Sequence, residues 1–204
     1  MIARISHSPP VNLPNAITLS RLVLTAVFVV AMGFDGLGGK MTALVSFSVA
    51  AATDWLDGYL ARRMGLVTPL GKLLDPLADK ILVCAAFVFM SVEGFAPVWV
   101  TAVIIGREFL VTGLRQIAIE AGQVLAADRL GKWKTGFQLT FIITALVWLA
   151  FSEMSSRGMI AEFLWKLADP EGWLMPASLW LALALTVVSG WNYLWSGRGL
   201  LKAG

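Results

Sequence analysis

Apolar residues gather in six stretches of this chain, and each stretch is about as long as a helix that crosses a membrane. A helix needs roughly 20 mostly apolar residues to span the hydrocarbon core of a bilayer. The stretches are residues 14–33, 41–62, 68–92, 97–121, 131–151 and 173–195. The pattern therefore predicts an all-α integral membrane protein with six transmembrane helices, built as a single domain over residues 1–204.

The connection between the last two stretches, residues 152–172, is the longest in the chain. Within it, residues 159–168 have the spacing of an amphipathic helix. A helix with one apolar face and one charged face lies in the plane of the membrane surface. We therefore expect residues 159–168 to follow the membrane interface.

The composition supports a membrane protein. Hydrophobic residues make up 58% of the chain and charged residues 14%, and the mean hydropathy is +0.77. Soluble domains are roughly half apolar and about a quarter charged. The formal net charge of +3 is too small to indicate a nucleic-acid partner.

Lysine and arginine are distributed unevenly between the two ends of the predicted helices. Cytoplasmic ends of membrane helices carry an excess of these residues. If the N-terminus is cytoplasmic, the outside ends carry Lys40, Arg157 and Lys166. The inside ends then carry Arg4, Arg62, Arg63, Lys72, Arg129, Lys132, Lys134, Arg198 and Lys202. This bias predicts cytoplasmic termini and a multi-pass protein of the cell inner (cytoplasmic) membrane.

Four aspartates interrupt the second and third apolar stretches near their predicted cytoplasmic ends: Asp54, Asp57, Asp75 and Asp79. Helix residues three or four apart share a face, and the short turn between the two stretches allows the two faces to meet. Carboxylate oxygens without histidine or cysteine favour Mg²⁺ or Mn²⁺. Four carboxylates suffice for two divalent cations, which is an arrangement used for phosphoryl transfer.

Two other interpretations of the aspartates are open at this point. They could form buried ion pairs with the nearby basic residues, which are Arg62, Arg63, Lys72 and Lys80. They could also line an ion or proton pathway, because transporters use carboxylates within the membrane. The grouping of all four acids at one end of the predicted spans favours the metal site over a pathway at the midplane.

The stretch from Asp54 to Asp79 resembles the signature of the CDP-alcohol phosphatidyltransferase family, D-x2-D-G-x2-A-R-x8-G-x3-D-x3-D, at every fixed position. The resemblance implies six transmembrane helices and a dinuclear metal site in a polar cavity open to the cytoplasm. It implies that all four aspartates ligate the metals and that Asp79 is the catalytic base. It also implies that the CDP group lies against Asp57, Gly58, Ala61, Arg62, Thr68, Gly71 and Lys72.

Further segments are similar to family members that use sn-glycerol 3-phosphate as the acceptor. They are residues 12–21, Arg107-Glu108-Phe109, Gly113-Leu114-Arg115, and residues 131–135 with Gln138. This resemblance implies transfer of a phosphatidyl group from CDP-diacylglycerol to sn-glycerol 3-phosphate, with release of CMP, by a homodimer among membrane lipids. An acceptor that carries a phosphate needs cations. The candidates are Arg21, Arg107, Arg115, Lys132 and Lys134.

Several alternatives to this acceptor site are open. Glu108 could pair with Arg107 or Arg115 in a purely structural role, and the two lysines could be ordinary cytoplasmic charges. The acceptor could instead be inositol phosphate, serine or phosphatidylglycerol. A cation transporter is the alternative from a different functional class.

Overall fold

The computed structural model describes residues 13–64, 69–122 and 129–198. Within these ranges, the side chains of residues 13–17, 54–64, 69–79 and 129 are not described.

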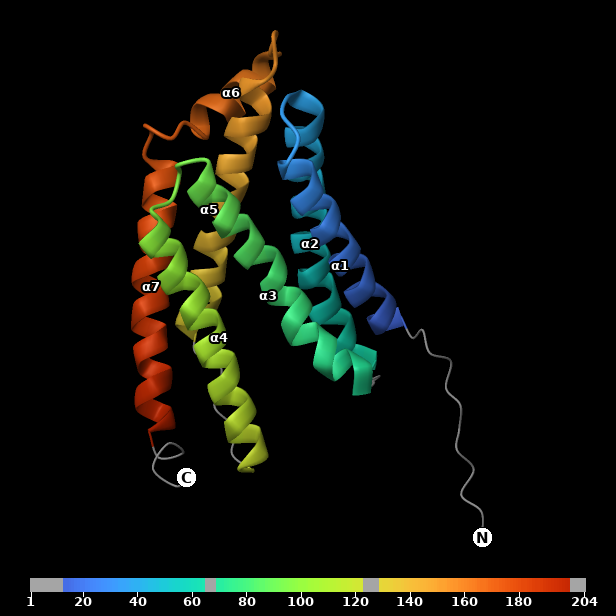
Figure 1. Cartoon of the computed structure of the whole chain (residues 1–204), viewed down its shortest axis with the longest axis vertical. Helices are drawn as coiled ribbons and strands as arrows, with labels where there is room; N and C mark the ends of the chain where they lie inside the picture. Colours follow the sequence, from blue (N-terminus) through green and yellow to red (C-terminus); the bar gives the residue numbers. More distant parts are fainter. Residues whose placement is uncertain (1–12, 65–68, 123–128, 199–204) are drawn as a thin grey trace.

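Every regular element in the described part of the chain is an α-helix (Figure 1). The helices are α1 (Leu13–Met32), α2 (Leu37–Met64), α3 (Pro69–Val92), α4 (Val98–Glu120), α5 (Arg129–Ser152), α6 (Met159–Leu167) and α7 (Leu174–Gly197). The six long helices match the six predicted apolar stretches to within a few residues, and α6 falls in the predicted amphipathic segment. The all-α prediction is confirmed.

The largest difference from the prediction is at the start of α2, which begins at Leu37 instead of near Met41. Gly39, in the first turn of α2, serves close packing. A Cβ atom at Gly39 would lie 2.5 Å from the carbonyl oxygen of Phe34. The turn after α1 therefore folds tightly against the first turn of α2, which leaves the helix free to start earlier.

Two helices in the described part are long and apolar enough to cross a membrane, Leu130–Ser152 and Leu174–Gly197. Shorter apolar helical segments occupy Thr18–Met32 and Lys80–Val92, within α1 and α3. These helices indicate a membrane protein. The number of spans and the orientation of the termini stay predictions.

Successive long helices run in opposite directions, so their ends alternate between the two ends of the molecule (Figure 1). The C-terminal ends of α2, α4 and α7 and the N-terminal ends of α1, α3 and α5 lie at the lower end in this view, while α6 lies at the upper end. The parts of α2 and α3 that carry the four aspartates therefore approach the same end of the molecule.

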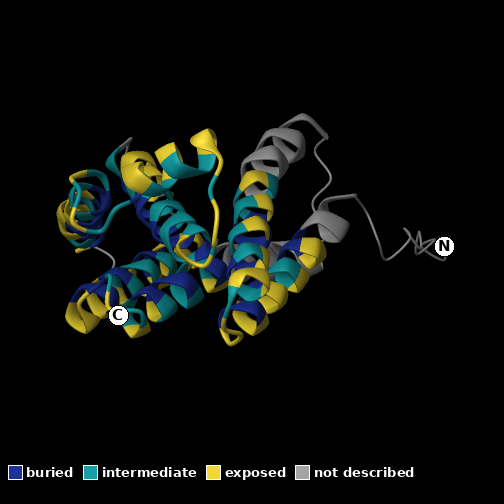
Figure 2. Cartoon of the chain, turned by 90° about the horizontal axis from the view of Figure 1, so that it is seen from above, coloured by how far each residue is buried: buried dark blue, intermediate teal, exposed yellow. Residues whose placement is uncertain are grey.

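The core is formed by aromatic and small side chains on the inner faces of the helices, which are the dark faces in Figure 2. The fully buried rings of Phe87 and Phe141 stack with centroids 5.5 Å apart and join α3 to α5. The rings of Phe28 and Phe47, with centroids 5.6 Å apart, join α1 to α2. Buried alanines between the rings allow close approach of the helix backbones, as is common where helices pack in lipid.

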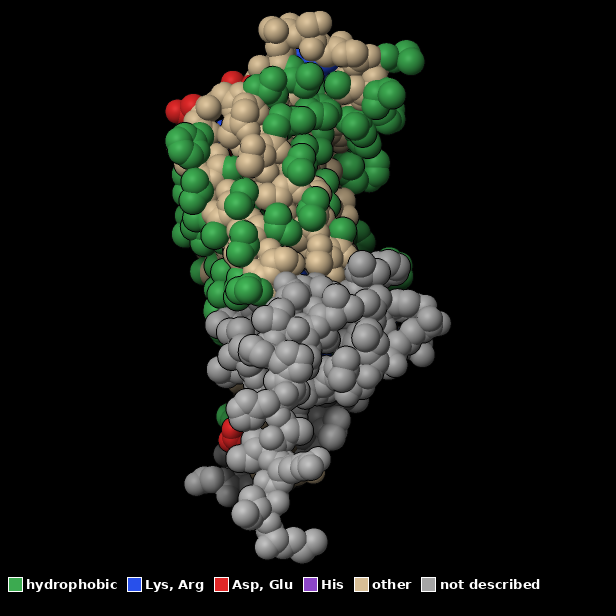
Figure 3. All heavy atoms as spheres, turned by 90° about the vertical axis from the view of Figure 1, so that its right-hand side faces the viewer, with side chains coloured by type: hydrophobic (Ala, Val, Ile, Leu, Met, Phe, Trp, Pro, Cys, Tyr) green, Lys and Arg blue, Asp and Glu red, His purple; other side chains and the backbone are tan. Residues whose placement is uncertain are grey.

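Apolar side chains also cover the outer face of α1 and α2, above the undescribed region (Figure 3). Val23, Val30, Phe34 and Val45 are all more than half exposed. A soluble protein rarely exposes a continuous apolar surface of this kind. The outer face of α1 and α2 is therefore suited to contact with lipid chains.

One ion pair ties the first turn of α2 to the residue that follows α3. Lys40 Nζ lies 2.8 Å from Glu93 Oε1, and the lysine side chain is only 8% exposed. Lys40 was counted among the outside charges in the sequence, and the structure shows that it is buried and paired. A buried charge that keeps its partner avoids most of the cost of leaving water.

We expect Lys40→Met to lower the stability of the detergent-solubilised protein by about 1–3 kcal/mol, because the Glu93 carboxylate loses its charged donor. The measurement is thermal or denaturant unfolding. Lys166→Met is the matched control, since the Lys166 side chain is 70% exposed in its pair with Glu162, and a surface pair is worth at most about 1 kcal/mol. Equal shifts in the two variants would contradict a structural role for the Lys40 pair.

Candidate functional site

The predicted metal site lies on two consecutive helices. The α2 helix carries Asp54, Asp57, Gly58, Ala61 and Arg62, and α3 carries Gly71, Lys72, Asp75 and Asp79. The side chains of all nine lie outside the described residues, as does Thr68, which stands between the two helices in the sequence. Among the side chains that the structure does describe, no group of three or more histidine, cysteine, aspartate or glutamate residues could hold a metal ion.

The donor set itself fits two hard cations. Asp54 and Asp57 are three residues apart on α2, and Asp75 and Asp79 are four apart on α3, so each pair shares one face of a helix. Carboxylate oxygens are the ligands that Mg²⁺ and Mn²⁺ take in proteins. The predicted ligands are therefore consistent with the helices that carry them.

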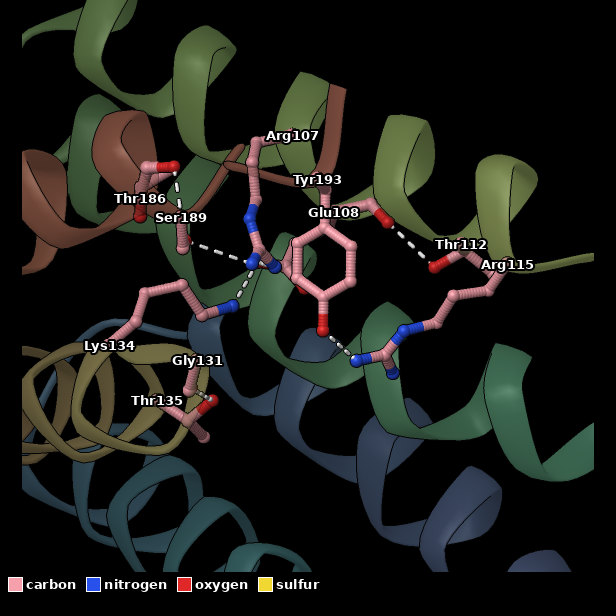
Figure 4. Close-up of polar contacts among 10 residues, drawn as sticks. All are labelled: Arg107, Glu108, Thr112, Arg115, Gly131, Lys134, Thr135, Thr186, Ser189 and Tyr193. Atoms are coloured by element: carbon pink, nitrogen blue, oxygen red, sulfur yellow. Dashed lines mark hydrogen bonds and ion pairs between the residues drawn. The ribbon is translucent and has the colours of Figure 1, made fainter. Parts of the chain in front are cut away.

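A second polar group is described in full, and it is built from α4, α5 and α7 (Figure 4). The α4 helix is unbroken from Val98 to Glu120 and carries Arg107, Glu108 and Arg115. Its partners come from the start of α5 and the second half of α7. We call this group the basic cluster; it consists of Arg107, Glu108, Arg115, Lys134, Ser189 and Tyr193.

Glu108 is the carboxylate of the basic cluster. It accepts a close ion-paired hydrogen bond from Lys134 Nζ, and its Oε1 lies 3.5 Å from Arg107 Nη1. The side chains of Lys134 and Glu108 are 5% and 12% exposed. The Arg107–Glu108 pair considered from the sequence is therefore present, and Lys134 is a buried, paired cation instead of a surface charge.

Tyr193 brings the two arginines of α4 together. Arg115 Nη2 donates a short hydrogen bond to the Tyr193 hydroxyl. The guanidinium carbons of Arg107 and Arg115 lie 5.7 and 5.0 Å from the centroid of the tyrosine ring. Arg107 Nη2 also donates to Ser189 Oγ at 2.9 Å. The eight-residue spacing on an unbroken helix thus places both arginines beside one residue of α7.

Three buried polar atoms near this region have no hydrogen-bond partner within the described part of the chain: Arg107 Nε, Gln138 Nε2 and Thr186 Oγ1. Buried polar groups are nearly always hydrogen-bonded in folded proteins. All three atoms can donate a hydrogen bond. They are therefore available to an acceptor atom on a ligand or to water.

The basic cluster lies close to the segment of α3 that carries the last predicted metal ligand. The α3 helix packs against both α4 and α5, which carry the cations of the cluster. Lys80 follows Asp79 directly in the sequence of α3. The cationic excess of the cluster thus borders the C-terminal end of the aspartate segment.

The other two predicted phosphate ligands, Lys132 and Arg21, come from α5 and α1. Lys132 is exposed, and no described contact joins it to the basic cluster. Arg21 is 3% exposed on α1, the helix that packs against α2 and α3. Of the five predicted cations, the structure brings Arg107, Arg115 and Lys134 together.

The sequence analysis assigned no chemistry to α7, so it missed Ser189 and Tyr193. Thr186, Ser189 and Tyr193 are spaced three and four residues apart, which places them on one face of an otherwise apolar helix. That spacing was the available signal. Glu108 was considered only as an ion-pair partner, and the structure makes it the shared partner of two cations.

Comparison with known proteins identifies the family. The model of the CDP-alcohol phosphatidyltransferase family matches residues 11–188. This chain belongs to the CDP-alcohol phosphatidyltransferase family. The match includes the aspartate segment of α2 and α3 and four of the six residues of the basic cluster, and Ser189 and Tyr193 lie just beyond its end.

Curated relatives within this phosphatidyltransferase family align over most of the chain. The CDP-diacylglycerol–glycerol-3-phosphate 3-phosphatidyltransferase of Bacillus subtilis is 41% identical over 194 residues, with 89% of this chain and 93% of the relative covered. The enzyme of the same name from Pseudomonas fluorescens is 41% identical, with 66% of this chain and 72% of the relative covered. The enzyme of that name from Salmonella typhimurium is 35% identical, with 92% of this chain and 96% of the relative covered.

Glu108→Gln removes the negative charge that Lys134 and Arg107 share, and we expect it to lower the stability of the protein by about 1–3 kcal/mol. Unfolding in detergent measures the change. Glu120→Gln, at the exposed end of the same helix, is the control and should stay within roughly 0.5 kcal/mol of the unsubstituted protein. If Glu108→Gln were as stable as Glu120→Gln, the carboxylate would not be the counter-ion of the cluster.

Proposed function

We propose that this protein transfers the phosphatidyl group of CDP-diacylglycerol to sn-glycerol 3-phosphate and produces phosphatidylglycerophosphate and CMP for phospholipid biosynthesis. The observation that carries the proposal is the 41% identity to the Bacillus subtilis enzyme of that activity over 89% of this chain. The complete family signature from Asp54 to Asp79 supports the reaction type.

The basic cluster supports an acceptor that carries a phosphate. Arg107 and Arg115 lie on either side of Tyr193, and guanidinium groups form strong, directional hydrogen bonds with phosphate oxygens. Arg115 is exposed and Arg107 is half-buried, so the pair leads from the surface towards the interior. Serine has no phosphate and would offer these cations only a single carboxylate.

We infer that Asp54, Asp57, Asp75 and Asp79 would hold two divalent cations, Mg²⁺ or Mn²⁺. When bound, the metals would neutralise the negative charge on the phosphates of CDP-diacylglycerol. The small residues Gly58, Ala61 and Gly71 would leave room for the CDP group against the helix backbones. Arg62 and Lys72 would contact its phosphate oxygens, with Thr68 beside them in the turn.

In this proposal Asp79 is the general base. Its carboxylate would take the proton of the acceptor hydroxyl, whose oxygen then forms a bond to the phosphorus that carries the diacylglycerol. The bond from that phosphorus to the bridging oxygen breaks, and CMP leaves with its electron pair. The α3 helix, which carries Asp79, packs against α4 and α5, which carry the cations of the basic cluster, and this supports an acceptor that reaches from the cluster to the proposed base.

The membrane placement of the reaction follows from the same features. We propose a single domain with six transmembrane helices, cytoplasmic termini and a polar cavity open to the cytoplasm, assembled as a homodimer in the inner membrane. The apolar outer face of α1 and α2, which Figure 3 shows, supports contact with lipid. The lipid tails of the substrate can then stay in the bilayer while both head groups enter from water.

The proposal is tested by measuring CMP release from CDP-diacylglycerol with the purified protein. We expect release only when sn-glycerol 3-phosphate is added. Inositol phosphate, serine and phosphatidylglycerol are the comparison acceptors, and a clear preference for one of them would assign the protein to a sibling activity. Flux of Mg²⁺ into liposomes without CMP release would favour a transporter.

Chelation with EDTA should abolish CMP release, and added Mg²⁺ or Mn²⁺ should restore it, whereas Zn²⁺ should do so poorly because the proposed ligands are all carboxylates.

Each of Asp54→Asn, Asp57→Asn, Asp75→Asn and Asp79→Asn should nearly abolish turnover in protein that still inserts and remains folded. Full activity in metal-free buffer, or rates near those of the unsubstituted protein in two of the four variants, would contradict the two-metal proposal.

Arg115→Ala should raise the apparent KM for sn-glycerol 3-phosphate roughly tenfold, because a charge-assisted hydrogen bond to phosphate contributes about 1.5 kcal/mol or more. The KM for CDP-diacylglycerol should change much less. Steady-state kinetics with each substrate varied in turn measures both values. Arg157→Ala, at the opposite end of the molecule, is the control. Equal shifts of both KM values in Arg115→Ala would give this arginine a structural role.

A further inference from the structure

The α7 helix contributes no charged side chain to the basic cluster, yet it contacts both arginines of α4. Ser189 accepts a hydrogen bond from Arg107, and Tyr193 accepts one from Arg115. Gly190 lies between these two residues in the sequence and faces the stem of Arg107. The polar face of α7 therefore touches each arginine at a different point.

Tyr193 holds two like charges beside one another. Its side chain is 4% exposed, and both guanidinium groups lie within 6 Å of the ring centroid. A ring face attracts cations, and this attraction strengthens where water is excluded. The hydroxyl adds a hydrogen bond with Arg115. Together these contacts offset part of the repulsion between two cations that would otherwise move apart.

Gly190 determines where the stem of Arg107 can lie. A Cβ atom at this position would be 3.1 Å from Arg107 Cγ, closer than an ordinary van der Waals contact. The missing side chain lets the arginine stem rest directly against the backbone of α7. A methyl group at position 190 would therefore require the stem of Arg107 to shift away from the backbone of α7.

We propose that Tyr193 is a positioning residue, and that Tyr193 and Gly190 together set the spacing of Arg107 and Arg115 at which the phosphate of the acceptor is bound. This inference rests on the proposed function and deepens it. The polar face of α7 acts through the arginines and makes no contact with the reacting atoms. The arrangement is preorganised, so the acceptor phosphate meets two guanidinium groups that are already in place.

The test compares variants that alter each contact separately. Tyr193→Phe removes the hydroxyl and keeps the ring, whereas Tyr193→Leu removes both. Gly190→Ala adds a single methyl group against Arg107. Gly136→Ala, on α5, is the matched control, because a Cβ atom there meets nothing within 4 Å. Steady-state kinetics gives KM for each substrate and kcat, and the rise in melting temperature on adding sn-glycerol 3-phosphate reports binding without turnover.

We expect Tyr193→Phe to raise the KM for sn-glycerol 3-phosphate roughly three- to tenfold, which is the effect of one lost hydrogen bond. The KM for CDP-diacylglycerol should stay within about twofold, since that substrate makes no use of the pair. Tyr193→Leu should have a larger effect than Tyr193→Phe, and Gly190→Ala should resemble Tyr193→Phe. The stabilisation by sn-glycerol 3-phosphate should shrink in the same order, and Gly136→Ala should match the unsubstituted protein.

The outcomes separate this inference from the proposed function. If the unsubstituted protein released no CMP with sn-glycerol 3-phosphate, the proposed function and this inference would both be wrong. If it did, and Tyr193→Phe and Gly190→Ala kept an unchanged KM for the acceptor, only the positioning role would be wrong. A parallel rise in both KM values would likewise overturn it, because a loss of packing affects both substrates.

Discussion

The structure depends on how charged side chains are kept inside an apolar helical bundle. A charge removed from water is tolerated when it has a close partner of opposite sign, and it is costly when that partner is missing. In the basic cluster, Glu108 fills this role for Lys134 and for Arg107. Because Glu108 and Arg107 come from α4 and Lys134 comes from α5, the ion pairs that make these residues tolerable also connect the two helices through their side chains.

The same constraint explains why the cluster can serve a ligand. Its cations outnumber its one carboxylate, and Arg107 Nε, Gln138 Nε2 and Thr186 Oγ1 have no partner in the described part of the chain. A fully paired network would have no capacity left for substrate. The excess of donors is instead the property expected of a pocket that is completed by an anion. Tyr193 holds that excess in place by giving two cations one neutral surface to share.

The sequence predicts the helices well because their signal is local. Long apolar runs locate all six long helices, and the spacing of charged and apolar residues locates α6. The start of α2 was placed too late because the role of Gly39 depends on contact with Phe34, which the sequence does not display. The exposed Lys132 and the buried Lys134 could have been separated beforehand. Residues two apart on a helix point to nearly opposite sides, so the two lysines were poor candidates for one pocket.

The aspartates could be predicted from the sequence alone, whereas the contacts of the α7 residues could not. Eight fixed positions between Asp54 and Asp79 occur within one short segment, so the pattern is complete without any knowledge of which helices pack together. Ser189 and Tyr193 are 82 and 78 residues from the arginines that they contact. Their spacing marks a polar face of α7, but the partners of that face depend on α7 packing against α4, a tertiary contact that the sequence does not display.

The α3 helix connects the aspartate segment with the surroundings of the basic cluster. Its first half carries Asp75 and Asp79, and the helix packs against α4 and α5, which carry most of the basic cluster. In the proposed reaction, the phosphate of the acceptor binds the cluster while its hydroxyl reaches Asp79. One continuous helix can serve both requirements, because its rigid backbone fixes the position of the aspartates relative to the helices that carry the cluster.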